Sequence, residues 1–371
     1  MLKIGMCPNP FYETDWSRTA NPNLIWQAEA IEQKGAEIIP LTRKQVQNPA
    51  LWHTLHLDVV HLHWPAAVFN FIIRRKQIQM VLPQMFVVKW AERILKKWEK
   101  DVLKSGIPIV WQVHDILSHH AVGYNYPADL MMHETIFRST DGLLLNGAGS
   151  LQPVVDFYGI EKPYCVAPLG SYRKLYGEPI PRDEALSRLG ISTHGMVFSY
   201  LGTARPKRNP AATIEAFLQQ ANESDVLIIA GNNMNLYVTE QLDQRIKLFS
   251  GVIPAKQFHE IICASDFVIN DGKKYLTSAI IRAAASYSKP VIAYAYGSAI
   301  DMAKNAAIWI DDDHGGLGGA IREASNVKST EWQKLSDGAA LNEKSLTWEE
   351  NGIASMALYE QVIAARKANG N

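Results

Sequence analysis

A short basic segment in the second half of the sequence carries the residue types of an anion site. It runs from Gly202 to Asn209, and its three cations are Arg205, Lys207 and Arg208. Guanidinium groups form paired hydrogen bonds that match phosphate oxygens, and a helix that starts directly after the segment adds backbone N–H donors. We therefore expect this segment to bind the phosphates of a ligand. A solvated basic loop is the alternative interpretation.

The neighbouring residues place this segment between a strand and a helix. The apolar run 196–201 precedes it, and a helical run, 211–219, follows it. Pro210 stands near the first turn of that helix, where its missing N–H removes no hydrogen bond. Gly202 permits a tight exit from the strand. The pattern is that of a strand, a turn and a helix, with the cations in the turn.

Short apolar runs separated by helical stretches recur along the chain in two series. Several of these runs lack alternation, as strands that are buried on both faces of a parallel sheet do. We therefore predict an α/β protein with two doubly wound, Rossmann-like domains, whose ligands bind beyond the carboxyl ends of the strands. The expected strands are 2–7, 36–41, 58–63, 108–114, 142–145 and 164–167, followed by 196–201, 226–230, 247–249, 267–270, 290–293 and 307–310.

Length and charge agree with two globular domains. The chain has 371 residues, which is enough for two cores, and Lys plus Arg equals Asp plus Glu at 37 each. Net charge therefore predicts no nucleic-acid binding, so that a basic site has to be local. The segment 168–181, rich in Gly, Pro and Tyr, indicates a linker. We place the first domain at 1–175 and the second at 176–345, with an amphipathic helix in 346–371.

Aromatic and histidine side chains follow two expected strands of the first domain. The strand 108–114 ends in His114, which Asp115 follows, and the strand 58–63 ends in His63, which Trp64 follows. Carboxyl ends of parallel strands form the ligand edge of a doubly wound sheet, so we expect His114 to contact a ligand. The pair His61 and His63 also fits a metallohydrolase, and a purely structural pair is the third interpretation.

Residues 202–217 resemble the retaining GT4-like glycosyltransferases. One subgroup has a turn of the form Gly-x-x-Arg-Pro-x-Lys-Asn, followed by a helix that ends in Glu-Ala-Phe. Here Arg205 falls on the arginine, Arg208 on the lysine, and 215–217 on the helix end. The resemblance implies a GT-B fold, in which the two Rossmann-like domains face each other across a cleft. It also implies that Arg205 and Arg208, beside Gly202, bind the diphosphate of a UDP- or GDP-linked sugar donor, with no cofactor.

The resemblance covers most of the chain with weak identity. The run 228–231 looks like the strand and glycine before the nucleobase pocket, and 249–253 looks like the segment whose backbone contacts the base. These matches imply that Asn232, Val252 and Ile253 bind the donor. The tail from Trp348 resembles the closing helix that crosses back onto the first domain.

One part of the sequence departs from the family. GT4-like enzymes usually carry two glutamates eight positions apart, for the donor sugar and the ribose, where this chain has Tyr275 and Ala283. Some GT-B subgroups lack the pair, including inverting enzymes of exopolysaccharide assembly, so the stereochemical outcome stays open. Side chains that offer replacement contacts, some of them at a helix start, are Asp271, Lys273, Lys274, Thr277 and Ser278.

The same resemblance implies that His114 contacts the donor sugar or the leaving group. An inverting reaction needs a carboxylate base, for which Asp15 and Asp115 are the candidates. No catalytic metal is expected, because the arginines take the charge of the diphosphate. The candidates for acceptor binding are Tyr12, His63 and Trp64.

The helical run Phe86 to Lys104 is both apolar and basic. Its expected buried arc includes Trp90 and Ile94, and residues 69–106 hold nine Lys or Arg against three Asp or Glu. A crossover helix with a solvated basic face is one interpretation, and attachment to an anionic membrane through 69–104 is the other. The second interpretation suits a lipid-linked acceptor in surface polysaccharide synthesis.

Other sequence features concern the compartment. The N-terminus becomes polar too soon for a signal peptide, no run of about 18 apolar residues occurs, and the three cysteines lack a pairing pattern. We expect a cytoplasmic protein with free thiols, placed in the cytosol or at the inner face of the cell membrane. The alternatives are a GT-B nucleotide-sugar epimerase, a non-catalytic nucleotide-sugar-binding protein and, third, a nicotinamide dehydrogenase, for which 147–149 lacks a glycine.

Overall fold

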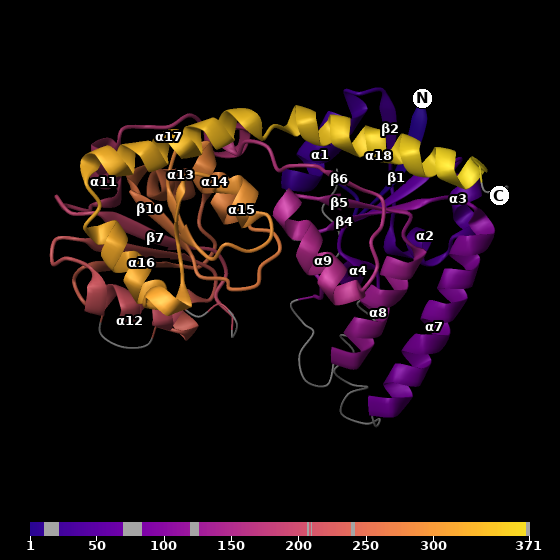
Figure 1. Ribbon diagram of the computed structural model, residues 1–371, viewed down its shortest axis with the longest axis horizontal. Helices are drawn as coiled ribbons and strands as arrows, with labels where there is room; N and C mark the ends of the chain where they lie inside the picture. Colours follow the sequence, from indigo (N-terminus) through magenta and orange to yellow (C-terminus); the bar gives the residue numbers. More distant parts are fainter. Residues whose placement is uncertain are drawn as a thin grey trace. The chain divides into compact units, whose positions relative to one another are not determined.

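The structure is a computed structural model that describes residues 1–10, 22–69, 84–118, 126–205, 208, 210–238 and 242–368. The chain forms two compact units (Figure 1). Unit 1 comprises Met1–Pro168 and Trp348–Asn371, and unit 2 comprises Leu169–Thr347. The boundaries expected from the sequence lie after residues 175 and 345.

Each unit is built on a six-stranded parallel sheet. The strand order is β2-β1-β3-β4-β5-β6 in unit 1 and β12-β11-β10-β7-β8-β9 in unit 2. All twelve expected strands are confirmed, and each of their ends lies within one residue of its expected place. Their bounds are β1 Leu2–Cys7, β2 Ala36–Pro40, β3 Val59–Leu62, β4 Ile109–Val113, β5 Gly142–Leu145, β6 Tyr164–Val166, β7 Val197–Leu201, β8 Val226–Gly231, β9 Ile246–Ser250, β10 Phe267–Asn270, β11 Val291–Ala293 and β12 Ala307–Trp309.

Helices connect the strands, as right-handed crossovers of a doubly wound fold require. The α-helices of unit 1 are α1 Pro22–Glu32, α2 Arg43–Gln47, α3 Ala50–Thr54, α4 Pro65–Val68, α7 Gln84–Ser105, α8 Tyr126–Ser139, α9 Leu151–Tyr158 and α18 Trp348–Ala368. Those of unit 2 are α10 Arg173–Tyr176, α11 Arg182–Leu189, α12 Pro210–Gln220, α13 Ala255–Ala264, α14 Ala279–Ser286, α15 Ala299–Met302, α16 Gly316–Ser325 and α17 Ser329–Ser345.

Every residue of the central strands is buried, which is why their sequences do not alternate. In β3, β4 and β5 of unit 1, and in β7, β8 and β10 of unit 2, no position reaches solvent. Rings of Phe198, Phe217 and Phe267 pack together in the unit 2 core. The carboxyl ends of these rigid strands therefore provide fixed positions for side chains in the loops that follow.

The helix α18 belongs to unit 1 and closes its core. Leu358, Tyr359 and Val362 are buried among side chains of β1, β3 and β4. A Cβ at Gly142 of β5 would come within 2.9 Å of Val362 and 3.0 Å of Leu358. The helix therefore needs a glycine beneath it.

One expectation about α7 is wrong. Trp90 was placed on the buried arc of this helix, yet it is 37% exposed. The stripe that packs against unit 1 is narrower, because it consists of positions three or four residues apart and leaves Trp90 at its edge. The buried apolar side chains are Val87, Ala91, Leu95, Trp98 and Val102.

Two further observations concern the described residues. None of their helices combines the length and the apolar content that crossing a bilayer requires. Cys7 and Cys263 are buried and Cys165 is half-buried, all as free thiols, as expected.

Candidate functional site

The basic segment of unit 2 forms a tight turn between β7 and α12. The backbone N–H of Arg205 donates to the carbonyl of Arg208 at 3.1 Å, and the N–H of Arg208 donates to the carbonyl of Arg205 at 2.7 Å. The turn therefore fixes both arginines at the carboxyl end of a buried strand. Lys207 and Asn209 lie outside the described residues.

Two glycines let the ends of β7 and β8 approach each other under this turn. Gly202 has φ +130° and Gly231 has φ +142°, a region that side chains disfavour. A Cβ at Gly231 would lie 1.6 Å from the carbonyl oxygen of Gly202, and a Cβ at Gly202 would lie 2.6 Å from Nη1 of Arg208. Both positions therefore require glycine.

Arg208 is buried beneath the turn. The residue is 8% exposed, its Nη2 donates to the carbonyl of Leu201, and its guanidinium carbon lies 5.5 Å from the ring centre of Tyr200. Among the described residues, the buried Nε atoms of Arg208 and Arg205 have no hydrogen-bond partner. Buried donors are rarely left unpaired, so these two atoms are candidates for contact with a polar ligand.

Asp271 and Asn270 stand at the end of β10, the strand next to β7. Burial raises the pKa of Asp271, against the effects of the Arg208 charge and of a hydrogen bond from Thr213 Oγ1 at 3.2 Å. Oδ1 of Asn270 is buried without a partner. Unsatisfied polar atoms thus occupy the ends of two adjacent strands, where doubly wound sheets bind ligands.

Of the other residues expected to bind the donor, Asn232 lies directly after Gly231. The carbonyl of Asn232 accepts from the N–H of Ala204 at 2.9 Å, and the N–H of Gly251 donates to the carbonyl of Gly231 at 3.0 Å. These bonds join the loops after β7, β8 and β9. Val252, which follows, is 79% exposed, and Ile253 is half-buried.

Residues after β10 are arranged differently from one another. Lys273 forms an exposed ion pair with Asp312. Ser278 is the N-cap of α14, and its side chain makes no capping hydrogen bond. Thr277, beside it, is half-buried. Ala283 is 1% exposed within α14, and the ring of Tyr275 lies against Gly272. The two positions that were compared with the glutamates of GT4-like enzymes therefore hold a tyrosine and a buried alanine.

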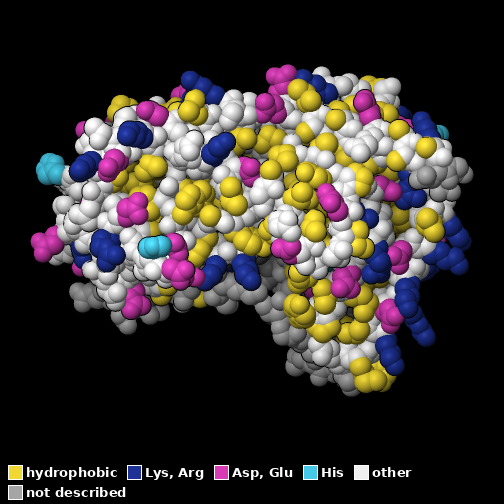
Figure 2. Space-filling view, in the orientation of Figure 1, with side chains coloured by type: hydrophobic (Ala, Val, Ile, Leu, Met, Phe, Trp, Pro, Cys, Tyr) yellow, Lys and Arg dark blue, Asp and Glu magenta, His cyan; other side chains and the backbone are white. Residues whose placement is uncertain are grey.

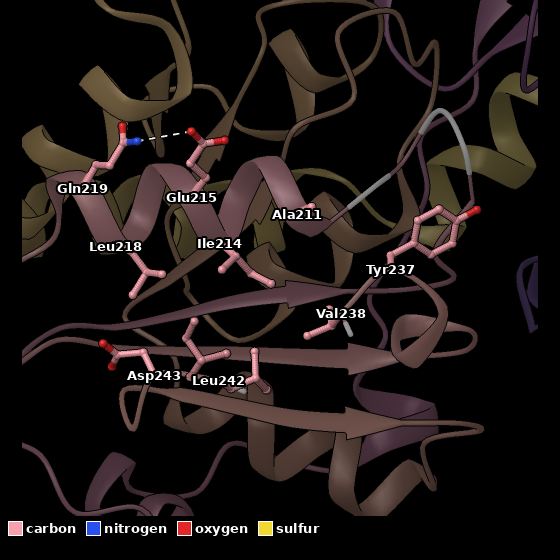
Figure 3. A pocket seen from close by; sticks show the side chains of 10 residues that line it. Ala211, Ile214, Glu215, Leu218, Gln219, Tyr237, Val238, Leu242 and Asp243 are labelled. Atoms are coloured by element: carbon pink, nitrogen blue, oxygen red, sulfur yellow. Dashed lines mark hydrogen bonds between the residues drawn. The ribbon is translucent and has the colours of Figure 1, made fainter. Parts of the chain in front are cut away.

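A separate hollow of about 580 Å³ runs along α12 (Figure 3). Glu215 of the Glu-Ala-Phe motif lines it and accepts a hydrogen bond from Gln219 at 3.2 Å, whereas Phe217 is fully buried in the core. Figure 3 shows mostly apolar side chains around it, from α12 on one side and from the segment before β9 on the other. Phe217 of the motif therefore packs α12 against the core of unit 2, whereas Glu215 is exposed.

In unit 1, histidine rings stack at the carboxyl ends of β3 and β4. Nδ1 of His63 lies 3.0 Å from Nε2 of His114, and the Trp64 ring stacks on His114 with centres 4.5 Å apart. The His61 and His63 rings stack at 4.4 Å, and the hydroxyl of Tyr359 in α18 lies 2.7 Å from Nδ1 of His61. The pairing of His63, Trp64 and His114 brings together residues that the sequence analysis selected separately.

Burial keeps these histidines neutral. It lowers the pKa of His61 and of His114 to about 3, and lowers that of His63 well below its ordinary value, with neighbouring histidines adding to the effect on His61 and His63. His114 is therefore suited to hydrogen bonding rather than to proton donation at neutral pH. His63 is 1% exposed, so we reassign it from contacting the acceptor to supporting His114.

A chain of buried amides approaches His114 from the opposite side. Nε2 of Gln27 donates to Oε1 of Gln112 at 2.9 Å, Nε2 of Gln112 donates to Oδ1 of Asn146 at 2.8 Å, and Nδ2 of Asn146 lies 3.5 Å from Nδ1 of His114. Sequence reasoning missed these three amides. A signal existed for one of them, because Gln112 interrupts an otherwise apolar strand.

Of the remaining candidate residues, one lies within the part of the chain that the structure describes and two lie outside it. Asp115 is half-buried directly after His114, whereas Tyr12 and Asp15 lie outside the described residues. Within the described ranges, no three His, Cys, Asp or Glu side chains are grouped as metal ligands.

Comparisons with known proteins identify the fold. No protein-family model matches the sequence, and no curated protein does. Sucrose-phosphate synthase of Thermosynechococcus elongatus superposes with a TM-score of 0.68 at 13% identity, over 98% of this chain and 100% of that one. HepE of Anabaena, solved in complex with UDP-glucose, gives 0.60 at 15%, over 99% and 100%. WaaG, a glycosyltransferase involved in lipopolysaccharide biosynthesis, gives 0.61 at 14%, over 96% and 99%.

The chain therefore has the GT-B fold. Two parallel six-stranded sheets, each flanked by helices, match these glycosyltransferases along nearly their full length. The fold that the basic turn suggested is thereby confirmed.

Proposed function

We propose that this protein is a glycosyltransferase that moves a sugar from a nucleotide diphospho-sugar, UDP- or GDP-linked, to a carbohydrate acceptor. The observation that carries the proposal is the pair of partnerless Nε atoms of Arg205 and Arg208 in the turn that Gly202 opens. A diphosphate offers anionic oxygens to such donors. The complex of HepE with UDP-glucose supports the proposal, because HepE has the same fold.

The chemistry follows from the charges that develop during transfer. The bond between the sugar and the diphosphate breaks, the diphosphate keeps the electron pair, and the acceptor hydroxyl oxygen bonds to the sugar carbon. Arg205 and Arg208 stabilise the departing diphosphate without a metal ion. Asp115 takes the hydroxyl proton in an inverting reaction, with Asp15 as the other candidate, and neutral His114 hydrogen-bonds the sugar.

The proposal also covers the identity of the acceptor. A lipid-linked saccharide in surface polysaccharide synthesis suits the basic helix α7, and it would place the protein at the inner face of the cell membrane, in contact with anionic lipid through 69–104. The role of WaaG in lipopolysaccharide biosynthesis supports this choice. Trp64, half-buried against His114, is the acceptor contact among the described residues.

Donor binding tests the proposal. Calorimetric titration with UDP-, GDP- and ADP-sugars should identify one that binds, and Arg205→Ala combined with Arg208→Ala should remove that binding. Arg322→Ala, an exposed substitution in α16 of the same unit, serves as the control. If the double variant binds every nucleotide sugar as tightly as the unmodified protein, the proposal fails.

A second candidate rests on the residues at the former glutamate positions. With Tyr275 and buried Ala283 there, the protein would be a nucleotide-sugar epimerase or a non-catalytic nucleotide-sugar-binding protein. Epimerised nucleotide sugar, or binding that never leads to turnover with any acceptor, supports this candidate. Acceptor-dependent release of the nucleoside diphosphate supports transfer instead.

A further inference from the structure

Large apolar side chains are exposed at the beginning of α7. Met85 is 57% exposed, Phe86 is 53% exposed and Trp90 is 37% exposed. Phe86 and Trp90 are four residues apart and therefore lie on one face of the helix. Clustered exposed apolar side chains are a common feature of surfaces that contact a partner or a membrane.

Basic side chains surround this apolar group. Phe86 and Trp90 line a hollow of about 470 Å³ together with Lys89, Arg93 and Lys96. Figure 2 shows Lys and Arg side chains along the outer side of α7 and apolar side chains at its lower end. The acidic residue of the hollow, Glu92, is paired with Lys96 at 2.6 Å, so positive charge remains in excess there.

The opposite face holds α7 rigidly in unit 1. Val87, Leu95 and Trp98 are buried, and Nε1 of Trp98 donates to the carbonyl of Val46 at 2.8 Å. Toward its carboxyl end, Glu99 pairs with Arg138 of α8 at 3.1 Å. The exposed aromatic side chains therefore contribute little to the unit's core, and the helix presents them in a fixed orientation.

We propose that the α7 patch, consisting of Met85, Phe86, Lys89, Trp90, Arg93 and Lys96, docks on an anionic lipid surface. Aromatic side chains favour the boundary between headgroups and acyl chains, while lysine and arginine contact lipid phosphates. Charge complementarity selects lipid as the occupant, because the patch joins an apolar wedge to a cationic rim. The patch deepens the membrane contact of the proposed function by naming its residues, although lipid binding does not depend on donor chemistry.

Vesicle flotation tests the patch on the full-length chain. We expect binding to phosphatidylcholine vesicles that contain phosphatidylglycerol, weaker binding in high salt, and little binding to phosphatidylcholine alone. Phe86→Ser with Trp90→Ser, and separately Lys89→Glu with Arg93→Glu, should each lower the partition coefficient about tenfold or more. Leu341→Ser removes an apolar side chain that is more exposed, at 64%, in α17 of unit 2, and it should leave vesicle binding unchanged.

Contrary outcomes are equally defined. The proposal is overturned if both double variants have the melting temperature of the unmodified protein and bind anionic vesicles with the same partition coefficient. It is also overturned if the protein does not bind vesicles but binds RNA through the same side chains. Titration with soluble nucleotide sugar separates the two proposals, because lipid docking can fail while donor binding persists, or the reverse.

Discussion

The guanidinium group of Arg208 lies against Gly202, so closely that a Cβ on residue 202 would come within 2.6 Å of Nη1. The same glycine has φ +130°, and its carbonyl oxygen leaves no space for a Cβ on Gly231. The backbone of the β7 end and the arginine side chain are therefore fitted to one another. Whatever binds at this turn depends on that fit.

Substitution Gly202→Ala should displace Arg208 and weaken donor binding. The strained backbone costs about 1–3 kcal/mol of folding free energy, and loss of one charged hydrogen-bonding group lowers affinity by about tenfold or more. The measurements are the free energy of unfolding and the calorimetric affinity for the nucleotide sugar that binds.

Gly177→Ala is the matched control for this prediction. Gly177 has φ +97°, and a Cβ there would meet no atom within 4 Å. It should cost stability through strain alone and leave the affinity unchanged. Equal affinities for both variants would contradict the role given to the contact between Gly202 and Arg208.

Acid should destabilise unit 1 through its histidines. The folded pKa of His61 and His114 is lowered from 6.5 to about 3, so below pH 6.5 the unfolded chain binds protons that the folded chain does not. Stability is therefore fully present above pH 6.5 and falls as the pH decreases toward 3. Each such histidine contributes a slope of up to about 1.4 kcal/mol per pH unit.

The variant His61→Gln isolates one of these contributions. Between pH 6.5 and 5, chemical denaturation should show a slope smaller by up to about 1.4 kcal/mol per pH unit than in the unmodified protein. His53→Gln, an exposed substitution in α3, should leave the slope unchanged. An unchanged slope in His61→Gln would show that this imidazole is not held neutral by burial.

Removal of the buried Arg282 side chain should destabilise unit 2 strongly. Nε of Arg282 donates to the carbonyl of Leu169 at 2.7 Å, Nη2 donates to the carbonyl of Leu346 at 2.8 Å, and Nη1 lies 2.8 Å from a carboxylate oxygen of Glu343. Arg282→Met leaves that carboxylate with only the more distant Arg173, whose Nε lies 3.8 Å from its other oxygen. We expect a loss of about 3–5 kcal/mol in the free energy of unfolding.

The double variant Arg282→Met with Glu343→Gln tests the electrostatic part of this effect. It removes the carboxylate charge that has lost its closest cation, so it should recover part of the lost stability. The coupling between the two side chains is contradicted if Glu343→Gln destabilises Arg282→Met by as much as it destabilises the unmodified protein.

The strands could be predicted because local sequence determines them. Runs such as Val59–Leu62 and Phe267–Asn270 are buried on both faces, so their apolar character is continuous and readily recognised. The basic turn could also be predicted, because its cations are adjacent in the sequence. Burial of Arg208 under Gly202 could not, because it depends on the approach of the β7 and β8 ends.

Contacts between distant residues account for what the sequence analysis missed. Gln27, Gln112 and Asn146 form a chain only after β4 and β5 pair and α1 packs against the sheet. Tyr359 reaches His61 from the last helix, 298 residues further along the chain. Burial of Trp90 was predicted incorrectly, because a helical wheel shows which side chains share an arc of the helix. It does not show how much of that arc the rest of the protein covers.

The comparison of UDP with uridine as ligands tests the central claim most directly, provided that a UDP-sugar is the donor that binds. If Arg205 and Arg208 hold the diphosphate, the unmodified protein should bind UDP more tightly than uridine by about a hundredfold or more, since each arginine adds charged hydrogen bonds. The variant carrying Arg205→Ala and Arg208→Ala should bind the two ligands with similar affinity. A preference for UDP that survives both substitutions would contradict the account.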